Sequence, residues 1–129
     1  ETIKKSLYDD GVASLQIITI RDDKALYYQN NPDFIQQYIF PGGVLPSKNQ
    51  LKNLSKEIGL SFIERQNFKN SYAKTLQMWN KKFQKAWPNI ASQHGFSIRF
   101  KKMWEYYLVY CEVGFITGAT DVSHFTLKK

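Results

Sequence analysis

Apolar positions in the chain form short runs typical of strands and longer stretches with helical spacing. Val12 to Ile20 is a mostly apolar run rich in β-branched residues, which predicts a buried strand. Leu60 to Phe68 predicts a second strand, through Phe62 and Ile63. Val122 to Leu127 alternates between two sets of side chains and predicts a closing strand.

Helical stretches lie between these runs. Pro32 favours a helix start, Ser47 is a good N-cap, and Gly59 stops the helix that Ser47 begins. Ser71 is the expected N-cap of a long helix that ends near Trp87-Pro88. The expected helices are Glu1–Tyr8, Asp33–Tyr38, the stretch from Ser47 to Ile58, Ser71–Trp87 and Ile98–Phe115, whereas Arg21–Asn31 is read as a loop or a frayed helix.

Both long helices carry apolar stripes. The first stripe is Tyr72, Leu76, Trp79 and Phe83, at i, i+4, i+7 and i+11. The second is Tyr107, Cys111 and Phe115, with Phe100, Trp104 and Leu108 beside it. Two helices this aromatic need a shared apolar partner.

The order of elements predicts an α/β fold. A helix, a turn with Gly11 and a strand apolar on both faces are typical of the last parallel strands of an open sheet that helices cover on both sides. Gln16 is the polar exception in the strand Val12–Ile20. We expect its side chain to point into the ligand crevice at the strand ends.

The segment Gln37–Ser47 combines two prolines, Pro41 and Pro46, with the pair Gly42-Gly43, and apolar residues flank the glycines. Prolines fix the backbone and glycines allow another group to approach it closely. One interpretation is a helix stop followed by a helix start. The other is a shaped loop that folds inward against something apolar.

Composition and charge narrow the classes of function. The 129 residues are 43% hydrophobic and suffice for one domain, and no stretch is long and apolar enough to span a bilayer. The single cysteine, Cys111, suits a reducing compartment. The start at Glu1, without an initiator Met or a signal peptide pattern, predicts a partial chain. The net charge of +7 favours anionic partners, membranes or nucleic acids, although scattered lysines are also typical of solvated helix faces.

The sequence lacks the motifs of several kinds of functional site. His94, His124 and Cys111 have no second ligand at a zinc-like spacing, so no metal site is predicted, and both histidines are interpreted as structural or exposed. The pair Gly42-Gly43 lacks the spacing of a dinucleotide-binding loop. The basic residues form no nucleic-acid recognition motif.

Four blocks resemble one family in the same order. They are Phe40-Pro-Gly-Gly-Val-Leu-Pro46, Ser71–Trp79, Arg99–Phe115 and Asp121–Leu127. Together they resemble the C-terminal part of the cyclopropane-fatty-acyl-phospholipid synthases and mycolic acid cyclopropane synthases, which are S-adenosylmethionine-dependent methyltransferases acting on lipid double bonds. The resemblance implies that residues 1–129 are the C-terminal half of one class I (Rossmann-like) methyltransferase domain with inserted lipid-binding helices.

The resemblance also implies which residues do the chemistry. Tyr72 matches a tyrosine that helps to hold a bicarbonate ion, the general base; a core tyrosine bonded to a backbone carbonyl is the alternative. Ile18 matches a strand residue whose backbone contributes to the same anion site. Gln16 stands where many members have histidine, and a neutral amide can donate to an anion but cannot shuttle a proton. The residues matched to the acyl-binding tunnel and its loop are Phe40, Gly42, Gly43, Leu76, Tyr107, Cys111 and Phe115.

The family binds S-adenosylmethionine mainly through a glycine-rich turn and an acidic residue that these 129 residues lack, so the chain alone is expected to be inactive. The expected activity is methyl transfer to the double bond of an unsaturated acyl chain in phospholipids, on an anionic membrane surface, in a cytoplasmic, peripherally bound protein. The resemblance is compatible with a homodimer. Two alternatives stay open: methylation of an acyl carbon without ring closure, and a non-catalytic lipid-binding module.

Overall fold

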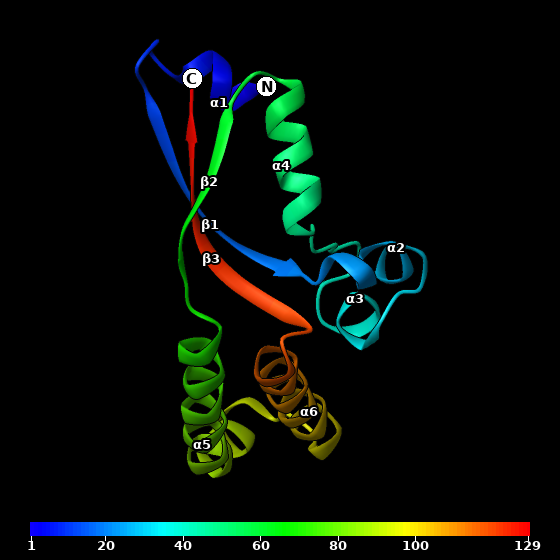
Figure 1. Ribbon diagram of the computed structural model, residues 1–129. Helices are drawn as coiled ribbons and strands as arrows, with labels where there is room; N and C mark the ends of the chain where they lie inside the picture. The colour runs from blue at the N-terminus through cyan, green and yellow to red at the C-terminus, as the bar shows by residue number, and fades with distance from the viewer.

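The computed structural model describes all 129 residues as a three-stranded sheet with helices beside it and at one end (Figure 1). Helix α4 lies along the sheet, α2 and α3 lie beside its lower end, where β1 ends, and α5 and α6 pack together beyond that end. The elements are α1 (Thr2–Ser6), β1 (Val12–Ile20), α2 (Asp22–Asn30), α3 (Phe34–Tyr38), α4 (Lys48–Glu57), β2 (Ser61–Asn67), α5 (Lys69–His94), α6 (Ile98–Thr117) and β3 (Thr120–Lys128).

The sheet order is β1-β3-β2, and β3 pairs antiparallel with both neighbours. The expectation of neighbouring parallel strands is therefore wrong. Between β2 and β3 the chain runs out along α5 and back along α6, so it re-enters the sheet at the end it left and must run in the opposite direction. Strands β1 and β2 do share a direction, but β3 separates them.

The expected bounds of β1 are confirmed, but its burial on both faces is not. Val12 is 56% exposed and Ile18 is 37% exposed, whereas Thr19 on the other face is buried. The central strand β3 holds the most buried side chains, with Val122 and Phe125 fully covered. Burial thus decreases from the central strand to the edge strand β1, as expected of a strand with one neighbour.

Helix starts agree with their capping chemistry where a cap exists. Ser47 and Gln50 form a capping box at the start of α4, and Asp33 forms another with Gln36 at the start of α3. Gly59, at φ +70°, follows the end of α4 as expected. The segment Arg21–Asn31, read as a loop or a frayed helix, contains the regular helix α2.

The prediction for α5 is wrong at both ends. The helix begins at Lys69, directly after β2, so Ser71 lies inside its first turn and is not the N-cap. It also continues through Pro88 to His94. A proline removes one backbone hydrogen bond, and packing of α5 against α6 helps to offset this loss. Trp79 is 54% exposed, so it does not belong to the buried face of α5, although the sequence placed it in the apolar stripe.

Helices α5 and α6 make a hydrophobic core with one face of β3. Tyr72 and Cys111 pack against this core from its edge. Because Val122 belongs to the sheet, the core joins the helical pair to the strands. Its buried members are Ala73, Leu76, Leu108, Phe115 and Val122.

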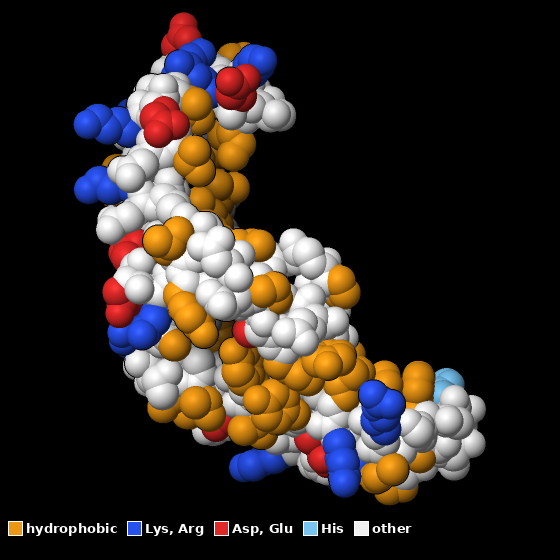
Figure 2. Space-filling view, turned by 90° about the vertical axis from the view of Figure 1, so that its right-hand side faces the viewer, with side chains coloured by type: hydrophobic (Ala, Val, Ile, Leu, Met, Phe, Trp, Pro, Cys, Tyr) orange, Lys and Arg blue, Asp and Glu red, His pale blue; other side chains and the backbone are white.

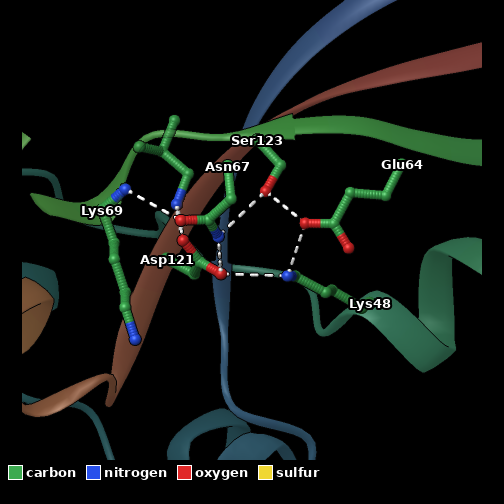
Figure 3. A network of polar contacts seen from close by, with 7 residues as sticks. Lys48, Glu64, Asn67, Lys69, Asp121 and Ser123 are labelled. Carbon is green, nitrogen blue, oxygen red and sulfur yellow. Dashed lines mark hydrogen bonds and ion pairs between the residues drawn. The ribbon is translucent and has the colours of Figure 1, made fainter. Parts of the chain in front are cut away.

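A polar network ties α4 to the other face of the sheet (Figure 3). Lys48 Nζ lies 2.7 Å from Glu64 Oε1 and 2.9 Å from Asp121 Oδ2, and Ser123 Oγ donates to Glu64 at 2.6 Å. Asn67 donates to Asp121 and accepts from the backbone N–H of Lys69, the first residue of α5. The network therefore fixes where α5 leaves the sheet.

Burial opposes the charge on Glu64, but the bonds from Lys48 and Ser123 outweigh it and hold the pKa of Glu64 below its usual 4.5. We expect Lys48→Met to lower the free energy of unfolding by about 1–2 kcal/mol, because two carboxylates lose their shared cation. Chemical denaturation measures this loss. The exposed Lys52 of the same helix makes no ion pair, so Lys52→Met is the matched control and should have little effect.

The same variant tests the pKa of Glu64. A carboxyl whose pKa is lowered by folding contributes stability above its unfolded pKa, and that contribution is lost as the pH falls through the folded value. The native protein should therefore lose stability below about pH 4.5 more steeply than Lys48→Met does. Parallel curves would show that Lys48 does not hold Glu64 ionised.

Candidate functional site

Two of the sequence-predicted catalytic residues, Gln16 and Tyr72, are hydrogen-bonded although 56 positions separate them. Gln16 Nε2 donates to Tyr72 Oη, and Tyr72 lies in the first turn of α5. The ring of Tyr72 lies 5.4 Å from the ring of Phe115. Its hydroxyl therefore lies toward the strands while its ring contacts the hydrophobic core.

His124 is a third member of this site that sequence reasoning interpreted as structural. It is the cross-strand partner of Gln16 in β3, and its Nε2 lies 3.1 Å from Gln16 Oε1. With the proton on Nε2, His124 donates to that oxygen and turns the amide NH₂ toward Tyr72. Tyr72 accepts from Gln16 and keeps its own proton for another acceptor. The ring of Phe68, 4.6 Å away, holds His124 from the side.

The backbone of Ile18 faces the open edge of the sheet. The N–H of Arg21 donates to the carbonyl oxygen of Ala119, just before β3, whereas that of Ile20 donates to the carbonyl oxygen of Pro46 on the opposite side. Backbone groups alternate along a strand, so the N–H of Ile18 lies on the same side as that of Ile20, away from β3. It is a donor that the sheet of these residues leaves free.

The residues matched to the acyl tunnel come together around Tyr107 and Cys111. Both pack against the core to which Leu76 and Phe115 belong, and those two are 5% and 4% exposed. Leu76 and Phe115 can therefore only form the back of a binding wall. Phe40 reaches the same place through an edge contact with Tyr107, with ring centres 6.2 Å apart.

Of the two interpretations of the proline-glycine loop, the helix stop followed by a helix start is confirmed, because α3 ends at Tyr38 and Ser47 caps α4, whereas the loop does not fold inward. Phe40 is 56% exposed and Val44 is 52% exposed, and a Cβ on Gly42 would meet no atom within 4 Å. Gly42 has φ +81°, which favours glycine. A Cβ on Gly43 would lie 3.1 Å from the carbonyl oxygen of Phe40. The glycines therefore shape a loop that lies open beside Tyr107.

Burial is the main cause of the pKa shifts of Tyr107 and Cys111, the two residues around which the binding wall is built. It raises the pKa of the Cys111 thiol to about 11, while a hydrogen bond with Tyr107 works in the opposite direction. Burial, followed by the nearby Cys111, raises the pKa of Tyr107 as well. Both groups are uncharged at neutral pH, which suits an apolar wall and excludes Cys111 as a ready nucleophile.

The indole N–H of Trp104 is the one buried side-chain polar atom without a hydrogen-bond partner. The ring of Trp104 meets that of Tyr107 edge-on at 5.3 Å. No group of three or more His, Cys, Asp or Glu side chains is arranged to hold a metal ion. No helix has the length and apolar character needed to cross a membrane.

The fold matches that of known methyltransferase structures. A crystal structure of mycolic acid cyclopropane synthase CmaA1, complexed with SAH and CTAB, aligns with a TM-score of 0.83 and 29% identity, over 98% of this chain and 47% of that one. This places the chain in the α/β methyltransferase class. Residues 1–125 match the family described as mycolic acid cyclopropane synthetase, and the chain belongs to that family.

Two curated relatives show the range of the family. The chain is 36% identical over 118 residues, 91% of its length, to the tuberculostearic acid methyltransferase UfaA1 of Mycobacterium tuberculosis. It is 41% identical over 86 residues, 67% of its length, to the cyclopropane-fatty-acyl-phospholipid synthase of Escherichia coli. The chain spans 27% and 22% of these relatives.

We expect Cys111 to be alkylated slowly in the folded protein. Raising a thiol pKa from 9.0 to about 11 lowers the thiolate fraction at pH 8 about 100-fold. Iodoacetamide labelling of the peptide containing Cys111, followed by mass spectrometry, measures the rate, with the urea-unfolded protein as the control. Equal rates in the two states would place Cys111 outside a buried wall.

Proposed function

We propose that these residues form the C-terminal portion of a methyltransferase domain and supply its acceptor side, for methyl transfer to the double bond of an unsaturated acyl chain. The observation that carries the proposal is the hydrogen bond between Gln16 and Tyr72 at the edge of an aromatic wall. The wall offers apolar contact for a hydrocarbon chain, and the hydroxyl offers a donor next to it. Family membership supports the reaction class.

The proposed reaction requires that the aromatic wall exclude water from the reacting carbons. S-adenosylmethionine, when bound, would supply an electrophilic methyl group: the π electrons of the alkene form the new C–C bond while the methyl–sulfur bond breaks and its electron pair stays on sulfur. The positive charge that develops on the neighbouring carbon is quenched by water if water is present. Tyr72 and Tyr107, which pack against the hydrophobic core, present rings that would exclude water and favour a nearby cation, and Phe40 meets Tyr107 from the exposed loop.

The donor set fits a small anion such as bicarbonate. Tyr72 keeps a free O–H, Gln16 has a second N–H, and the backbone N–H of Ile18 points to the open edge. Three neutral donors can hold an anion without pairing it with a cation, so the anion remains basic. We propose that Tyr72, Ile18 and the second N–H of Gln16 would hold the ion, with the amide of Gln16 oriented by His124. The ion would supply a proton acceptor beside the acyl chain.

A second candidate is methylation of an acyl carbon without ring closure. The match to a tuberculostearic acid methyltransferase over 91% of the chain favours it, as does a neutral glutamine at position 16. In both reactions the substrate gains CH₃⁺ and loses H⁺. They differ in where the proton leaves: loss from the added methyl closes a ring, whereas loss elsewhere keeps an alkene.

Lipids from cells that express the complete protein should gain the mass of one CH₂ group in their unsaturated acyl chains. Cells carrying an empty vector are the control. Mild catalytic hydrogenation then separates the two candidates, because an alkene product takes up hydrogen and a cyclopropane does not. A lipid profile identical to that of the control would favour a non-catalytic lipid-binding module.

We expect Tyr72→Phe to lower turnover by about 10²–10³ while lipid and cofactor affinity change little. The substitution keeps the ring against Phe115 and removes only the hydroxyl. Steady-state kinetics of the complete enzyme measure kcat and KM separately. Tyr27→Phe is the matched control, because Tyr27 is 71% exposed.

Gln16→Ala should act on the same group. Its effect combined with Tyr72→Phe should be smaller than the product of the two single losses, since both residues serve one anion. Normal turnover in Tyr72→Phe together with a lowered melting temperature would return Tyr72 to a purely structural role.

A further inference from the structure

A groove of about 520 Å³ lies between α3 and the first half of α6, and none of the sequence-predicted site residues lines it. Its size falls in the range of small-molecule sites. Five of its eight lining residues are apolar, with Ser97, Arg99 and Lys102 completing the set. The apolar ones are Phe34, Tyr38, Phe100, Met103 and Tyr106.

The groove follows from the sequence of α6 and from two contacts with α3. Arg99, Lys102 and Tyr106 recur at i, i+3 and i+7, which places them on one face of the helix. Phe34 meets Tyr106 edge-on with ring centres 4.6 Å apart. The hydroxyl of Tyr110 donates to Asp33, the N-cap of α3, at 2.8 Å. These contacts hold the short helix beside the long one.

The cations of the groove have no carboxylate partner. Lys101, the residue between them on the helix, pairs with Glu105, whereas neither Arg99 nor Lys102 makes an ion pair. The groove also reaches Ser97, the N-cap of α6, where the positive end of the helix dipole adds to the two charges. An anion of one or two charges is the ligand this rim complements.

The floor of the groove is exposed apolar surface. Tyr38 is 60% exposed and Tyr106 is 53% exposed. Figure 2 shows an apolar patch across this side of the molecule, with Lys and Arg side chains along its lower edge. A protein partner would have to bring carboxylates to avoid burying two unpaired cations. A phospholipid brings a phosphate and a hydrocarbon chain together.

Aromatic contacts connect the groove with the wall around Cys111. Phe100, on the groove, lies 6.0 Å from Trp104, which in turn meets Tyr107 at 5.3 Å. From Lys102 to Cys111 the helix rises about 14 Å, at 1.5 Å per residue. One leaflet of a bilayer has a hydrocarbon depth of about 15 Å. The spacing thus suits a lipid whose phosphate is in the groove and whose acyl chain runs toward Tyr72.

We propose that the groove between α3 and α6 binds the phosphate of a phospholipid in an anionic bilayer, with Arg99 and Lys102 as its cations and Tyr38 and Tyr106 on its apolar floor. The proposal rests on the proposed function, because the acyl substrate is what brings the protein to a bilayer. It adds a location for the headgroup and a direction for the acyl group.

Vesicle sedimentation with the complete protein tests the proposal. The probe is vesicles of equal parts phosphatidylglycerol and phosphatidylcholine. The double variant Arg99→Gln with Lys102→Gln should bind on the order of tenfold more weakly and with a smaller salt dependence. The control is Lys52→Gln with Lys56→Gln on α4, which removes the same charge far from the groove and should leave binding within about twofold (Figure 1).

A third variant tests the apolar floor. Tyr38→Ser should weaken vesicle binding several-fold and leave the salt dependence unchanged, because it removes apolar contact and no charge. Melting temperatures equal to that of the parent protein show that each variant is folded. If the groove double variant and the control double variant on α4 lose the same amount of vesicle binding, only the overall charge attracts the membrane. That result would overturn the proposal.

Two further outcomes are informative. If the groove double variant loses binding of inorganic phosphate but keeps vesicle binding, the ligand is free phosphate and the lipid proposal is wrong. Methyl transfer to detergent-dispersed lipid is measured in parallel. A parent protein that transfers no methyl group, while the groove variant still loses vesicle binding, would contradict the proposed function and leave the groove in place. Normal vesicle binding by the groove variant, in a protein that does transfer methyl groups, would contradict the groove proposal and leave the proposed function in place.

Discussion

The antiparallel insertion of β3 between β1 and β2 is the constraint on which the rest of the structure depends. Its pairing with β1 brings His124 opposite Gln16. Its pairing with β2 brings Ser123 and Asp121 to the polar network that ends at the first residue of α5. Tyr72 follows in the first turn of that helix. The hydroxyl thus meets the amide of Gln16 because one strand fixes both the partner strand and the helix start.

Alternation along β3 gives neighbouring side chains of this strand different partners. Val122 and His124 face the helical pair, where the first fills the core and the second orients Gln16. Ser123 and Phe125 face the other way, toward Glu64 and the stacked ring of Phe62. Adjacent side chains of one strand therefore meet different surroundings and should tolerate different substitutions, as the two-residue period of the strand requires.

Local sequence patterns predicted the helices and strands well, but they predicted poorly which elements pair and in which direction the strands run. The bounds of β1, the cap at Ser47 and the start of α6 at Ile98 all follow from features within a few residues. Strand direction does not, because it depends on the two helices between β2 and β3. The contact between His124 and Gln16 was missed for the same reason: the two residues are 108 positions apart, and only the register of the sheet makes them neighbours. The polarity of Gln16 within an apolar strand marked that residue and a resemblance to a family selected Tyr72, but no periodicity would have paired them.

The place of β3 in the sequence has a consequence for synthesis. Strands β1 and β2 do not pair with each other, and each pairs with β3, which becomes available only when residues 120–128 have been synthesised. Until then the edges of β1 and β2 that β3 will cover stay unpaired, and unpaired strand edges are prone to associate with other polypeptides. A stop codon before position 120 would remove the strand that joins β1 to β2, which is the centre of the three and not the margin. Loss of residues 120–128 would therefore separate the two outer strands as well as shorten the chain.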